Sequence, residues 1–562
     1  MSFNLLHEPW IPVRTATGAL AEVSILECFR QAPTLAAVTG ETPSQAASTL
    51  RLLIAILYRA LGDPGPRPGV AWQRWWDAGE LPSREIETYL ARYADRFDLF
   101  DTQRPFMQVA ALRTNKTSGL AKVIGDVPDG EQLFTTRAGA ELERLTPAEA
   151  ARWLVHCHAF DPSGIKTGAV GDPRVKGGKG YPIGIGWAGW CGLVLAEGAT
   201  LRETLLLNLA LNLDLDHDSA PWERPAHAVT VDRSHPEPQG PADILTWQPR
   251  RVVLVQGEQS DVVDVVIANG DPIHPRNRQA LEPHCGWRFS EPQTKLHKID
   301  VYMPRGHDPD RALWRGLPSL LPDASHDSRA GAKERPALPP NLLSWIASLV
   351  DNEHLPAGLP IHLRAIGVTY GAQSSTIAAM VDDGLRLRAG VVAAPALRQL
   401  VRDSVYSADL AATGLRQLAR NLAAARGIHE SDGEAARASE AGYSSLDTAY
   451  RVWLESLVPQ SDPIERLTAW QRFVGDTLGR LGDQLVDEAG EVAWLGRVSR
   501  RVDGTEHRID ASLASAYFRA ALRKALPLAF PSVDREHPGL SGPTEATNQP
   551  GASVPPSEED ER

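Results

Sequence analysis

The last third of the chain carries four long stretches in which apolar residues recur every three or four positions. They cover residues 389–427, 434–457, 463–488 and 510–526. The third is the most regular, because Asp462 suits a helix cap, Pro463 suits the first turn, and apolar side chains follow at helical spacing through Leu485. Four amphipathic helices joined by short loops predict a four-helix bundle.

The first 385 residues have a mixed pattern. Capping boxes at Thr42–Gln45 and Thr146–Glu149 predict two helix starts, and the second helix is expected to run through Phe160. Valine-rich segments near 251–255 and 262–267 predict strands, as do several short segments in the first 40 residues. Strand signals fade after about residue 383. We therefore predict the α+β class, with a large mixed N-terminal α/β domain at 1–385 and a C-terminal four-helix bundle at 386–530.

Residues 531–562 are rich in proline, serine and glutamate, which predicts a disordered acidic tail. The opening MSFNLLHEPW lacks the basic and apolar regions of a signal peptide, and the most apolar stretch, 181–196, is too short to cross a membrane. Four scattered cysteines without a close pair fit neither a disulfide scaffold nor a thiolate zinc site. We expect a cytoplasmic protein that does not engage a membrane.

Charge at first argues against a nucleic-acid partner. The 562 residues hold 58 Lys+Arg and 70 Asp+Glu, for a formal net charge of -12. The tail holds seven acidic and two basic side chains, or -5, which leaves -7 on residues 1–530. Two segments, at 172–181 and 287–298, are nevertheless locally basic. The acidic sum therefore predicts weak binding of duplex DNA by the chain alone, without excluding DNA as a partner.

The most informative of these segments is the glycine loop, Asp172-Pro173-Arg174-Val175-Lys176-Gly177-Gly178-Lys179-Gly180-Tyr181. Glycines let backbone amides approach a phosphate or a base edge closely, and the interleaved cations neutralise phosphate charge. The loop is not a Walker A motif, because no Gly-Lys-Ser/Thr sequence closes it. From the residues alone, a flexible surface loop remains an equal alternative. The second basic segment mixes cations with aromatics, as a nucleic-acid surface does, and an ordinary surface strand is its alternative.

Two clusters could suggest metal chemistry. Neighbours on a helix point about 100° apart, so His156, Cys157 and His158 cannot all bind one metal, and a structural histidine pair is favoured. The other cluster is Asp214, Asp216, His217 and Asp218, which resembles a metal-hydrolase motif but equally an acidic turn. No serine or cysteine nucleophile motif is present. An enzyme is therefore disfavoured, with a metal-dependent nuclease as the alternative.

Several strings together carry a family resemblance. FNLLHEPWIPVR at 3–14, LFDTQRPFMQVA at 99–110, and the order of glycine loop, LRETLLLNL segment and C-terminal helices resemble CasA, the large subunit of the type I-E CRISPR complex Cascade. The resemblance runs from about residue 3 to 528. It implies an N-terminal α/β domain and a four-helix bundle. It also implies a binding protein without catalysis or cofactor, which recognises the protospacer-adjacent motif (PAM) in duplex DNA and helps open the duplex.

The resemblance also implies site residues. The glycine loop, with Gly177, Gly178 and Gly180 flanked by Lys176 and Lys179, would meet the minor groove. Gln373 would be the wedge that splits the first base pair, and Lys295, with Lys298 as the alternative, would be the lysine finger. The loop at 132–137 would anchor the subunit near the 5′ handle of the guide RNA (crRNA), through Phe134, Thr135, Thr136 and Arg137, although a related sequence has asparagine at the place of Thr136.

The implied partners are the other Cascade subunits, the crRNA 5′ handle, double-stranded target DNA and the helicase-nuclease that degrades the target. R-loop formation, in which guide RNA pairs with the opened strand, would follow PAM recognition, and the role would be antiviral defence. A purely architectural subunit is a third hypothesis. It predicts that changes in the glycine loop alter assembly but not PAM discrimination.

Overall fold

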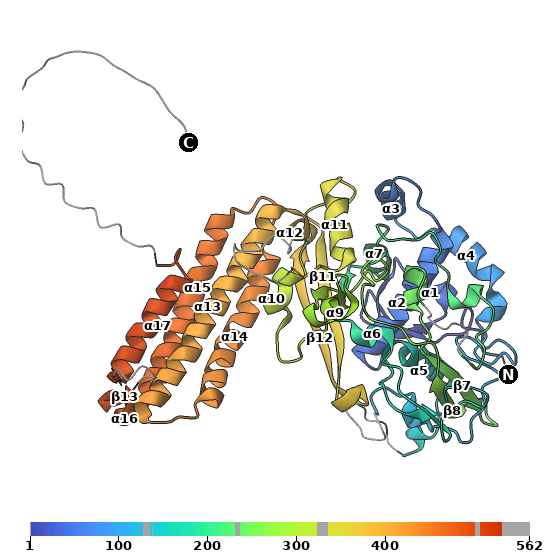
Figure 1. Cartoon of the computed structure of the whole chain (residues 1–562). Helices are drawn as coiled ribbons and strands as arrows, with labels where there is room; N and C mark the ends of the chain where they lie inside the picture. Colours follow the sequence, from blue (N-terminus) through green and yellow to red (C-terminus); the bar gives the residue numbers. More distant parts are fainter. Residues whose placement is uncertain are drawn as a thin grey trace, which may run out of the picture.

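The computed structural model has a mixed α/β part and a mainly helical part, which lie side by side (Figure 1). It describes residues 2–127, 135, 137, 139–230, 237–322, 335, 337–500 and 506–530. Four long helices form one side of the molecule, and a mixed α/β body forms the other (Figure 1). A long hairpin of strands β11 and β12 stands between them. Among the residues that the structure describes, no helix combines the length and apolar character needed to cross a bilayer.

The N-terminal part of the body is a small sheet packed on a buried helix. The sheet has the order β2-β1-β3, with β1 antiparallel to both neighbours. Helix α2 begins where the sequence predicts, because the Thr42 hydroxyl accepts the amide hydrogen of Gln45. Most of α2 is buried, including polar residues such as Gln45 and Arg51. The elements are β1 (Ile11–Thr15), β2 (Leu20–Val23), α1 (Ile25–Gln31), β3 (Leu35–Val38), α2 (Pro43–Leu61), α3 (Pro68–Asp77) and α4 (Ser83–Arg92).

The centre of the body is a three-stranded antiparallel sheet of order β12-β11-β6. Helix α5 contacts α2 beside this sheet, and both reciprocal bonds of the predicted Thr146–Glu149 capping box are present. The predicted end of α5 at Phe160 is also confirmed. The elements are α5 (Pro147–Phe160), α6 (Trp187–Trp190), β6 (Leu193–Glu197), α7 (Leu201–Leu207), α11 (Asn341–Asp351), β11 (Pro360–Tyr370) and β12 (Ile377–Arg388).

Smaller hairpins and short helices complete the body. The two valine-rich segments form the antiparallel pair β7–β8, as predicted. Their strands are β7 (Arg250–Gln256) and β8 (Val262–Asn269), and the other pairs are β4 (Lys166–Thr167) with β5 (Lys179–Gly180) and β9 (Trp287–Phe289) with β10 (Tyr302–Pro304). The short helices are η1 (Ala94–Arg96), η2 (Leu120–Lys122), η4 (Gly139–Leu142), η5 (Pro221–Glu223), α8 (Pro241–Leu245), α9 (Glu291–His297), α10 (Leu313–Gly316), η6 (Leu317–Ser319) and η8 (Ala372–Ser374).

The four predicted amphipathic stretches are helices. They are α13 (Pro395–Arg426), α14 (Asp432–Glu455), α15 (Pro463–Glu488) and α17 (Ala511–Ala525). The cap at Asp462 is confirmed, since its carboxylate accepts amide hydrogens from Ile464 and Glu465. Helix α13 packs against the other three helices. The approach of α15 to α17 requires glycine at Gly482, because a Cβ there would lie 2.1 Å from the Phe518 ring.

The C-terminal half differs from the predicted pattern in the following ways. Strand β12 continues to Arg388, past residues 383 and 385 where strand signals were expected to end. The first predicted helix is split into α12 (Ala389–Ala393) and α13, because the residue before Pro395 is sterically kept out of the helical region. A further hairpin, β13 (Arg497–Arg500) with β14 (Glu506–Ile509), follows α16 (Gly490–Leu495). Strands of four residues such as these are too short to give a clear alternating signal in the sequence.

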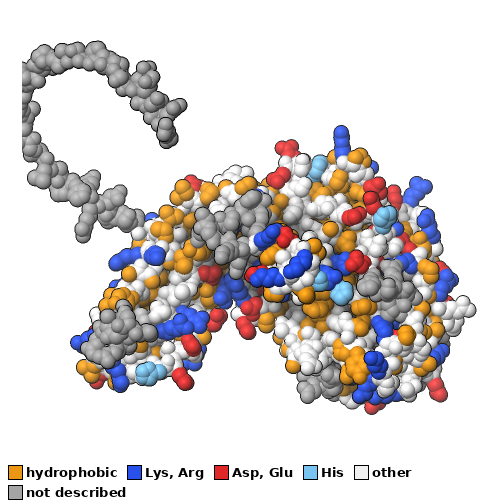
Figure 2. Space-filling model, viewed as in Figure 1, with side chains coloured by type: hydrophobic (Ala, Val, Ile, Leu, Met, Phe, Trp, Pro, Cys, Tyr) orange, Lys and Arg blue, Asp and Glu red, His pale blue; other side chains and the backbone are white. Residues whose placement is uncertain are grey.

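A polar junction joins the body to the long helices. The Arg451 guanidinium on α14 lies 2.9 Å from the Asp383 carboxylate on β12 and 2.8 Å from that of Asp447. Trp314 stacks on Tyr450, with ring centroids 4.6 Å apart. On the face shown in Figure 2, a notch still separates the two parts at their lower edge.

Candidate nucleic-acid interface

The glycine loop contains a tight two-residue hairpin. Lys176 and Lys179 exchange two backbone hydrogen bonds of 3.1 Å each, and Gly177 and Gly178 form the turn with φ of 59° and 73°. Positive φ at both central residues defines a type I′ turn, which matches the twist of the flanking strands and strongly favours glycine. Gly177 and Gly178 are exposed at the tip, whereas Gly180 is buried in β5 against Asn269. Of the three glycines predicted to face DNA, only two are therefore at the surface.

The basic side chains of the loop differ in whether they are free to contact a ligand. Lys176 and Lys179 flank the turn, and both are exposed. Arg174 instead lies 2.8 Å from the Asp172 carboxylate and donates to the backbone carbonyl groups of Asn269 and Gly270. Its charge is thus used to hold the loop against β8. Two lysine ammonium groups beside a glycine turn remain as the positively charged tip.

A buried ion cluster fixes the base of the loop. The Asp161 carboxylate follows α5 directly and binds Arg250 and, at 2.7 Å, Lys166. The Arg250 guanidinium also donates to the carbonyl oxygens of Pro162 and Gly184, which lie near the two ends of the segment 161–186 that joins α5 to α6 and contains the glycine loop. Burial by itself would raise the pKa of Asp161, but the charges of Lys166 and Arg250 outweigh it and hold that pKa below its usual range. This segment is therefore clamped at both ends, with the glycine turn exposed.

Gln373 lies at the tip of the β11–β12 hairpin. Gln373 and Ser374 both adopt left-handed backbone conformations, with φ of 55° and 54°. The turn is closed by a 2.9 Å hydrogen bond from the Gly371 amide to the Thr376 carbonyl oxygen. The Gln373 side chain is exposed. Because left-handed non-glycine residues are costly and concentrate at functional sites, this turn is a candidate contact point.

The segment 161–186, which contains the glycine loop, and the Gln373 hairpin line the same cavity. Its volume is about 200 Å³. Residues 161–166 line it from that segment, Ser375 and Ile377 from the hairpin, and residues 121–125 from the part around η2. Lys166 in this wall pairs with Gly180 of the glycine loop, whereas the exposed glycine turn and Gln373 themselves lie outside the cavity lining. Burial and the charge of Lys166 lower the pKa of Lys122 in its wall. The structure thus brings together two elements that are about 200 residues apart in the sequence.

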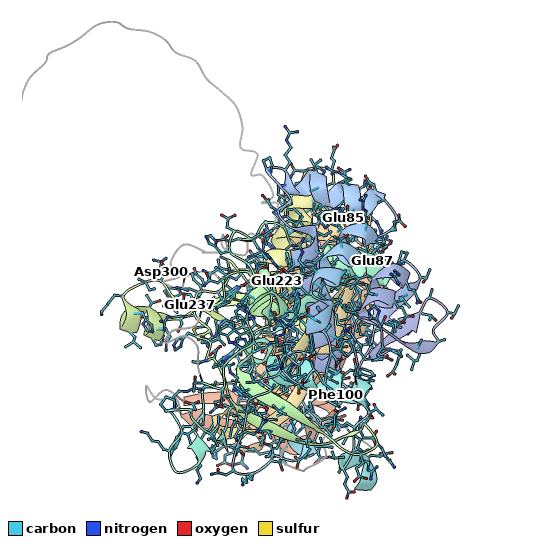
Figure 3. The ribbon with its side chains drawn as sticks, turned by 90° about the vertical axis from the view of Figure 1, so that its right-hand side faces the viewer. Glu85, Glu87, Phe100, Glu223, Glu237 and Asp300 are labelled. Atoms are coloured by element: carbon cyan, nitrogen blue, oxygen red, sulfur yellow. The ribbon has the colours of Figure 1, made fainter. Side chains whose placement is uncertain are left out.

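The two lysine-finger candidates lie on α9, which projects from the body. Lys295 and Lys298 are exposed, and basic side chains gather over this helix on the face shown in Figure 2. In the turned view of Figure 3, Asp300 marks the same projecting edge. The Lys295 ammonium lies 2.6 Å from the Glu291 carboxylate. Outside its own residues, α9 makes polar contacts with Arg276 and Val301, which belong neither to the glycine loop nor to the Gln373 turn.

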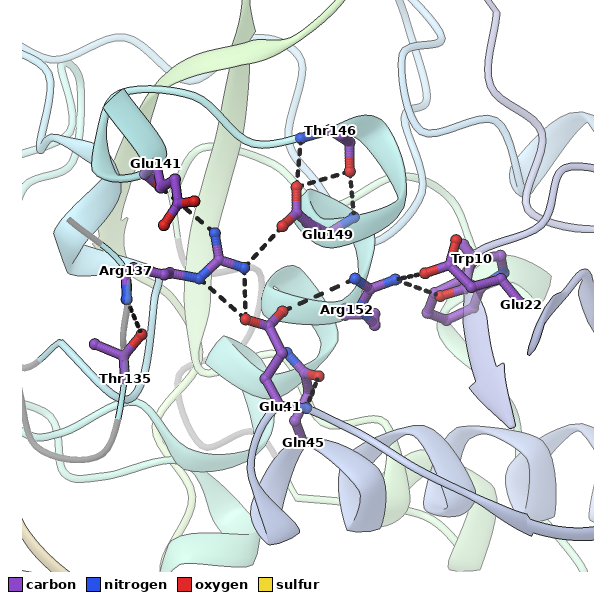
Figure 4. A network of polar contacts seen from close by, with 10 residues as sticks. All are labelled: Trp10, Glu22, Glu41, Gln45, Thr135, Arg137, Glu141, Thr146, Glu149 and Arg152. Atoms are coloured by element: carbon purple, nitrogen blue, oxygen red, sulfur yellow. Dashed lines mark hydrogen bonds and ion pairs between the residues drawn. The ribbon is translucent and has the colours of Figure 1, made fainter. Parts of the chain in front are cut away.

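The predicted RNA-anchoring loop is only partly described. Phe134 and Thr136 lie outside the described residues. Arg137 is held by the body, because its guanidinium lies between the carboxylates of Glu41, at 3.0 Å, and Glu149, at 2.8 Å (Figure 4). The Thr135 hydroxyl accepts the Arg137 amide hydrogen. Arg137 therefore fastens the end of this loop to the caps of α2 and α5.

The candidate metal clusters have structural roles. The Asp218 carboxylate is buried and accepts amide hydrogens from Ala242 and Asp243 at the start of α8. The His156 ring hydrogen-bonds to the Ser44 hydroxyl, and the His158 ring to the Met107 carbonyl oxygen. Within the described ranges, no group of three or more His, Cys, Asp or Glu side chains is arranged to bind a metal ion. No observation in the described residues therefore favours the nuclease alternative.

The two histidines predict acid sensitivity. Burial lowers the pKa of His156 to about 3 and that of His158 to about 4. Since the unfolded side chains titrate near pH 6.5, the unfolded state binds more protons below that pH, and stability falls as pH falls. The expected loss is about 2 kcal/mol per histidine between pH 6.5 and 5. Urea unfolding at both pH values would measure it. His156→Gln should flatten the dependence, whereas the exposed His217→Gln should not, and equal slopes in both variants would contradict the prediction.

Three residues that shape this interface were not predicted from the sequence. They are Asp161, Arg250 and Tyr370. Arg250 and Arg251 open a valine-rich strand, and a charged pair beside buried positions is a weak indication of an internal ion pair. Nothing in the sequence points to Tyr370, whose partner is 210 residues away.

Comparisons with known proteins agree with this architecture. The family model for CRISPR-associated protein Cse1 matches residues 4–481. CasA/Cse1 of Thermus thermophilus is 32% identical over 326 residues, which cover 57% of this chain and 60% of that relative, less than two thirds of its length. The crystal structure of Thermobifida fusca Cse1 is 41% identical, with a TM-score of 0.85 and coverage of 94% of this chain and 99% of that one. A chain of a CRISPR RNA-guided surveillance complex is 22% identical and shares the fold, with a TM-score of 0.62 and coverage of 87% and 99%. The CasA resemblance is confirmed, and the chain belongs to the CRISPR-associated Cse1 family.

Proposed function

We propose that this chain is the large, non-catalytic subunit of a CRISPR Cascade complex, in which it recognises the PAM in duplex DNA and helps open the duplex for pairing with crRNA. Family membership and the shared fold of a chain from a CRISPR RNA-guided surveillance complex support the assembly. The single observation that carries the site is that the segment with the exposed Gly177–Gly178 turn and the hairpin with the exposed Gln373 turn line one cavity, the first through residues 161–166 and the second through Ser375 and Ile377.

Each element has a chemical role in this proposal. A turn without side chains can bring its backbone against base edges in the narrow minor groove, while Lys176 and Lys179 neutralise phosphates. The minor groove offers a degenerate pattern, so such a reader should tolerate several PAM sequences. The flat amide of Gln373, on a hairpin anchored in the central sheet, suits a wedge between base pairs. Lys295 or Lys298 would add a contact from α9.

The remaining parts would serve assembly. The loop at 132–137 would bind near the crRNA 5′ handle, with Arg137 fastening its end. The four long helices would form a C-terminal bundle domain from about residue 386 to 530, contacting other Cascade subunits, and the complex would present DNA to the helicase-nuclease. This role in antiviral defence would place the protein in the cytoplasm.

Replacing the wedge tests the proposal. In the assembled complex, Gln373→Ala is expected to slow opening of the base pair next to the PAM by roughly tenfold or more, because unstacking costs a few kcal/mol. A fluorescent adenine analogue at that position would report opening. Gln417→Ala, on the exposed face of α13, is the matched control. Unchanged opening in both variants would remove Gln373 from this role.

A further inference from the structure

Three consecutive residues at the end of α5 anchor both candidate DNA-contacting elements. The Phe160 carbonyl oxygen accepts a 2.7 Å hydrogen bond from the Tyr370 hydroxyl at the end of β11. The next two residues, Asp161 and Pro162, receive the Arg250 guanidinium that clamps the glycine loop. The Asp161 carbonyl oxygen also accepts the Gly186 amide hydrogen at the far end of the loop, at 3.0 Å. One short segment therefore fixes two elements at once.

The Gln373 turn needs such an anchor. The β11–β12 ladder is regular from Pro360 to Thr369, but its register shifts between Thr369 and Tyr370, directly before the turn. An irregularity at this point bends the hairpin and interrupts the ladder hydrogen bonds, so the ladder alone does not fix the position of the turn. The Tyr370 hydroxyl, three residues before Gln373, supplies a contact from outside the hairpin. Burial and the Asp161 carboxylate raise the pKa of Tyr370, so its hydroxyl stays a hydrogen-bond donor at neutral pH.

The surroundings of Tyr370 are shaped for this bond. Gly189 on α6 leaves the space that the tyrosine ring occupies, because a Cβ at Gly189 would lie 2.2 Å from the hydroxyl oxygen. An alanine there would push the ring away while leaving its chemistry intact. Removing the hydroxyl and displacing it are therefore two separate ways to break the same contact.

We infer that Tyr370 is a positioning residue, whose bond to the Phe160 carbonyl oxygen sets the Gln373 turn in a fixed place relative to the glycine loop. The inference rests on the proposed function. It couples recognition to strand separation, since the wedge then enters the duplex at a set distance from the base pair that the glycine turn engages. Loss of the bond leaves DNA binding by the glycine loop in place and slows the opening step.

Tyr370→Phe and Gly189→Ala in the assembled complex test the coupling. Their controls are Tyr517→Phe, at an exposed tyrosine of α17, and Gly479→Ala, on α15 with open space at its Cβ. Affinity for a PAM-bearing duplex is measured first, and then the rate at which a fluorescent adenine analogue beside the PAM unstacks. A third measurement uses a duplex already mismatched at that pair.

Both test variants are expected to bind the PAM duplex within about twofold of the wild type and to open it roughly five- to tenfold more slowly, the size expected for one hydrogen bond. The mismatched duplex should restore the rate, which general damage to the fold would not allow. Wild-type opening rates in both variants, or slow opening that the mismatch does not restore, would overturn the inference. Wild-type opening that does not depend on the PAM or on Gln373 would instead contradict the proposed function.

Discussion

Gly178→Asp is expected to abolish PAM-dependent binding of duplex DNA by the assembled complex. The backbone at Gly178 has φ of 73°, and side-chain-bearing residues in this region cost roughly 1–2 kcal/mol. The aspartate would also place a negative charge between Lys176 and Lys179, where phosphates are proposed to lie. Since each 1.4 kcal/mol is tenfold in affinity, the combined effect should reach about 100-fold or more.

Electrophoretic titration of PAM-bearing and PAM-free duplexes would measure this effect. Gly79→Asp is a close control, because Gly79 has φ of 77°, is exposed and has open space at its Cβ. It adds the same strain and charge away from the interface. A second variant, Gly177→Asn, should keep the turn, since asparagine is favoured at the first position of a type I′ turn. If Gly178→Asp binds the PAM duplex as tightly as Gly79→Asp, the glycine turn does not read DNA.

Breaking the buried ion pair of the body should have the largest effect on stability. The Arg51 guanidinium binds both carboxylate oxygens of Glu282, at 2.9 and 2.8 Å, and both side chains are fully buried. The His284 ring and the Trp187 indole complete the cluster. Burial opposes ionisation of Glu282, but Arg51 holds the pKa of this carboxyl far below its usual range. Arg51→Met would leave this charge uncompensated, at an expected cost of roughly 3–5 kcal/mol.

Urea unfolding of the chain, followed by tryptophan fluorescence, would report this loss. Arg30→Met is the control, because Arg30 pairs with Glu87 on the exposed face of α4 (Figure 3), and such pairs contribute about 1 kcal/mol or less. The double variant Arg51→Met/Glu282→Leu should recover much of the loss, since an apolar pair carries no desolvation cost. A cost for Arg51→Met no larger than that of Arg30→Met would show that the pair does not stabilise the body.

The sequence predicted those helix caps and strands that depend on residues close together in the chain. The capping box at Thr146, the cap at Asp462 and the valine-rich strands are confirmed, because each depends on residues a few positions apart. The short helix α1, by contrast, lies in a region where the sequence predicted strands and turns. Its seven residues, capped by Ser24, are too few for periodicity to decide.

The candidate site was predictable only in part. The glycine turn and Gln373 were found from the sequence, and the structure shows that both are exposed. That Arg137 would be held by a carboxylate of the body could not be foreseen, because it meets Glu41 across 96 positions. Arg174 pairs with the nearby Asp172, but its bonds to the carbonyl groups of Asn269 and Gly270 likewise depend on the fold. Lys295 and Arg174 are both basic, yet the fold leaves the Lys295 side chain largely exposed and holds Arg174 against these carbonyl groups.

The sequence by itself determined the helices of the C-terminal part, the mixed texture of the body and membership of the Cse1 family, because hydrophobic periodicity, caps and family strings are properties of short segments. Only the tertiary structure decided that the segment containing the glycine loop and the Gln373 hairpin share a cavity and are fastened to the same end of α5. Such contacts join residues far apart in the chain, and hydrogen bonds and ion pairs act only over a few ångströms, so they exist only after folding has brought their partners together.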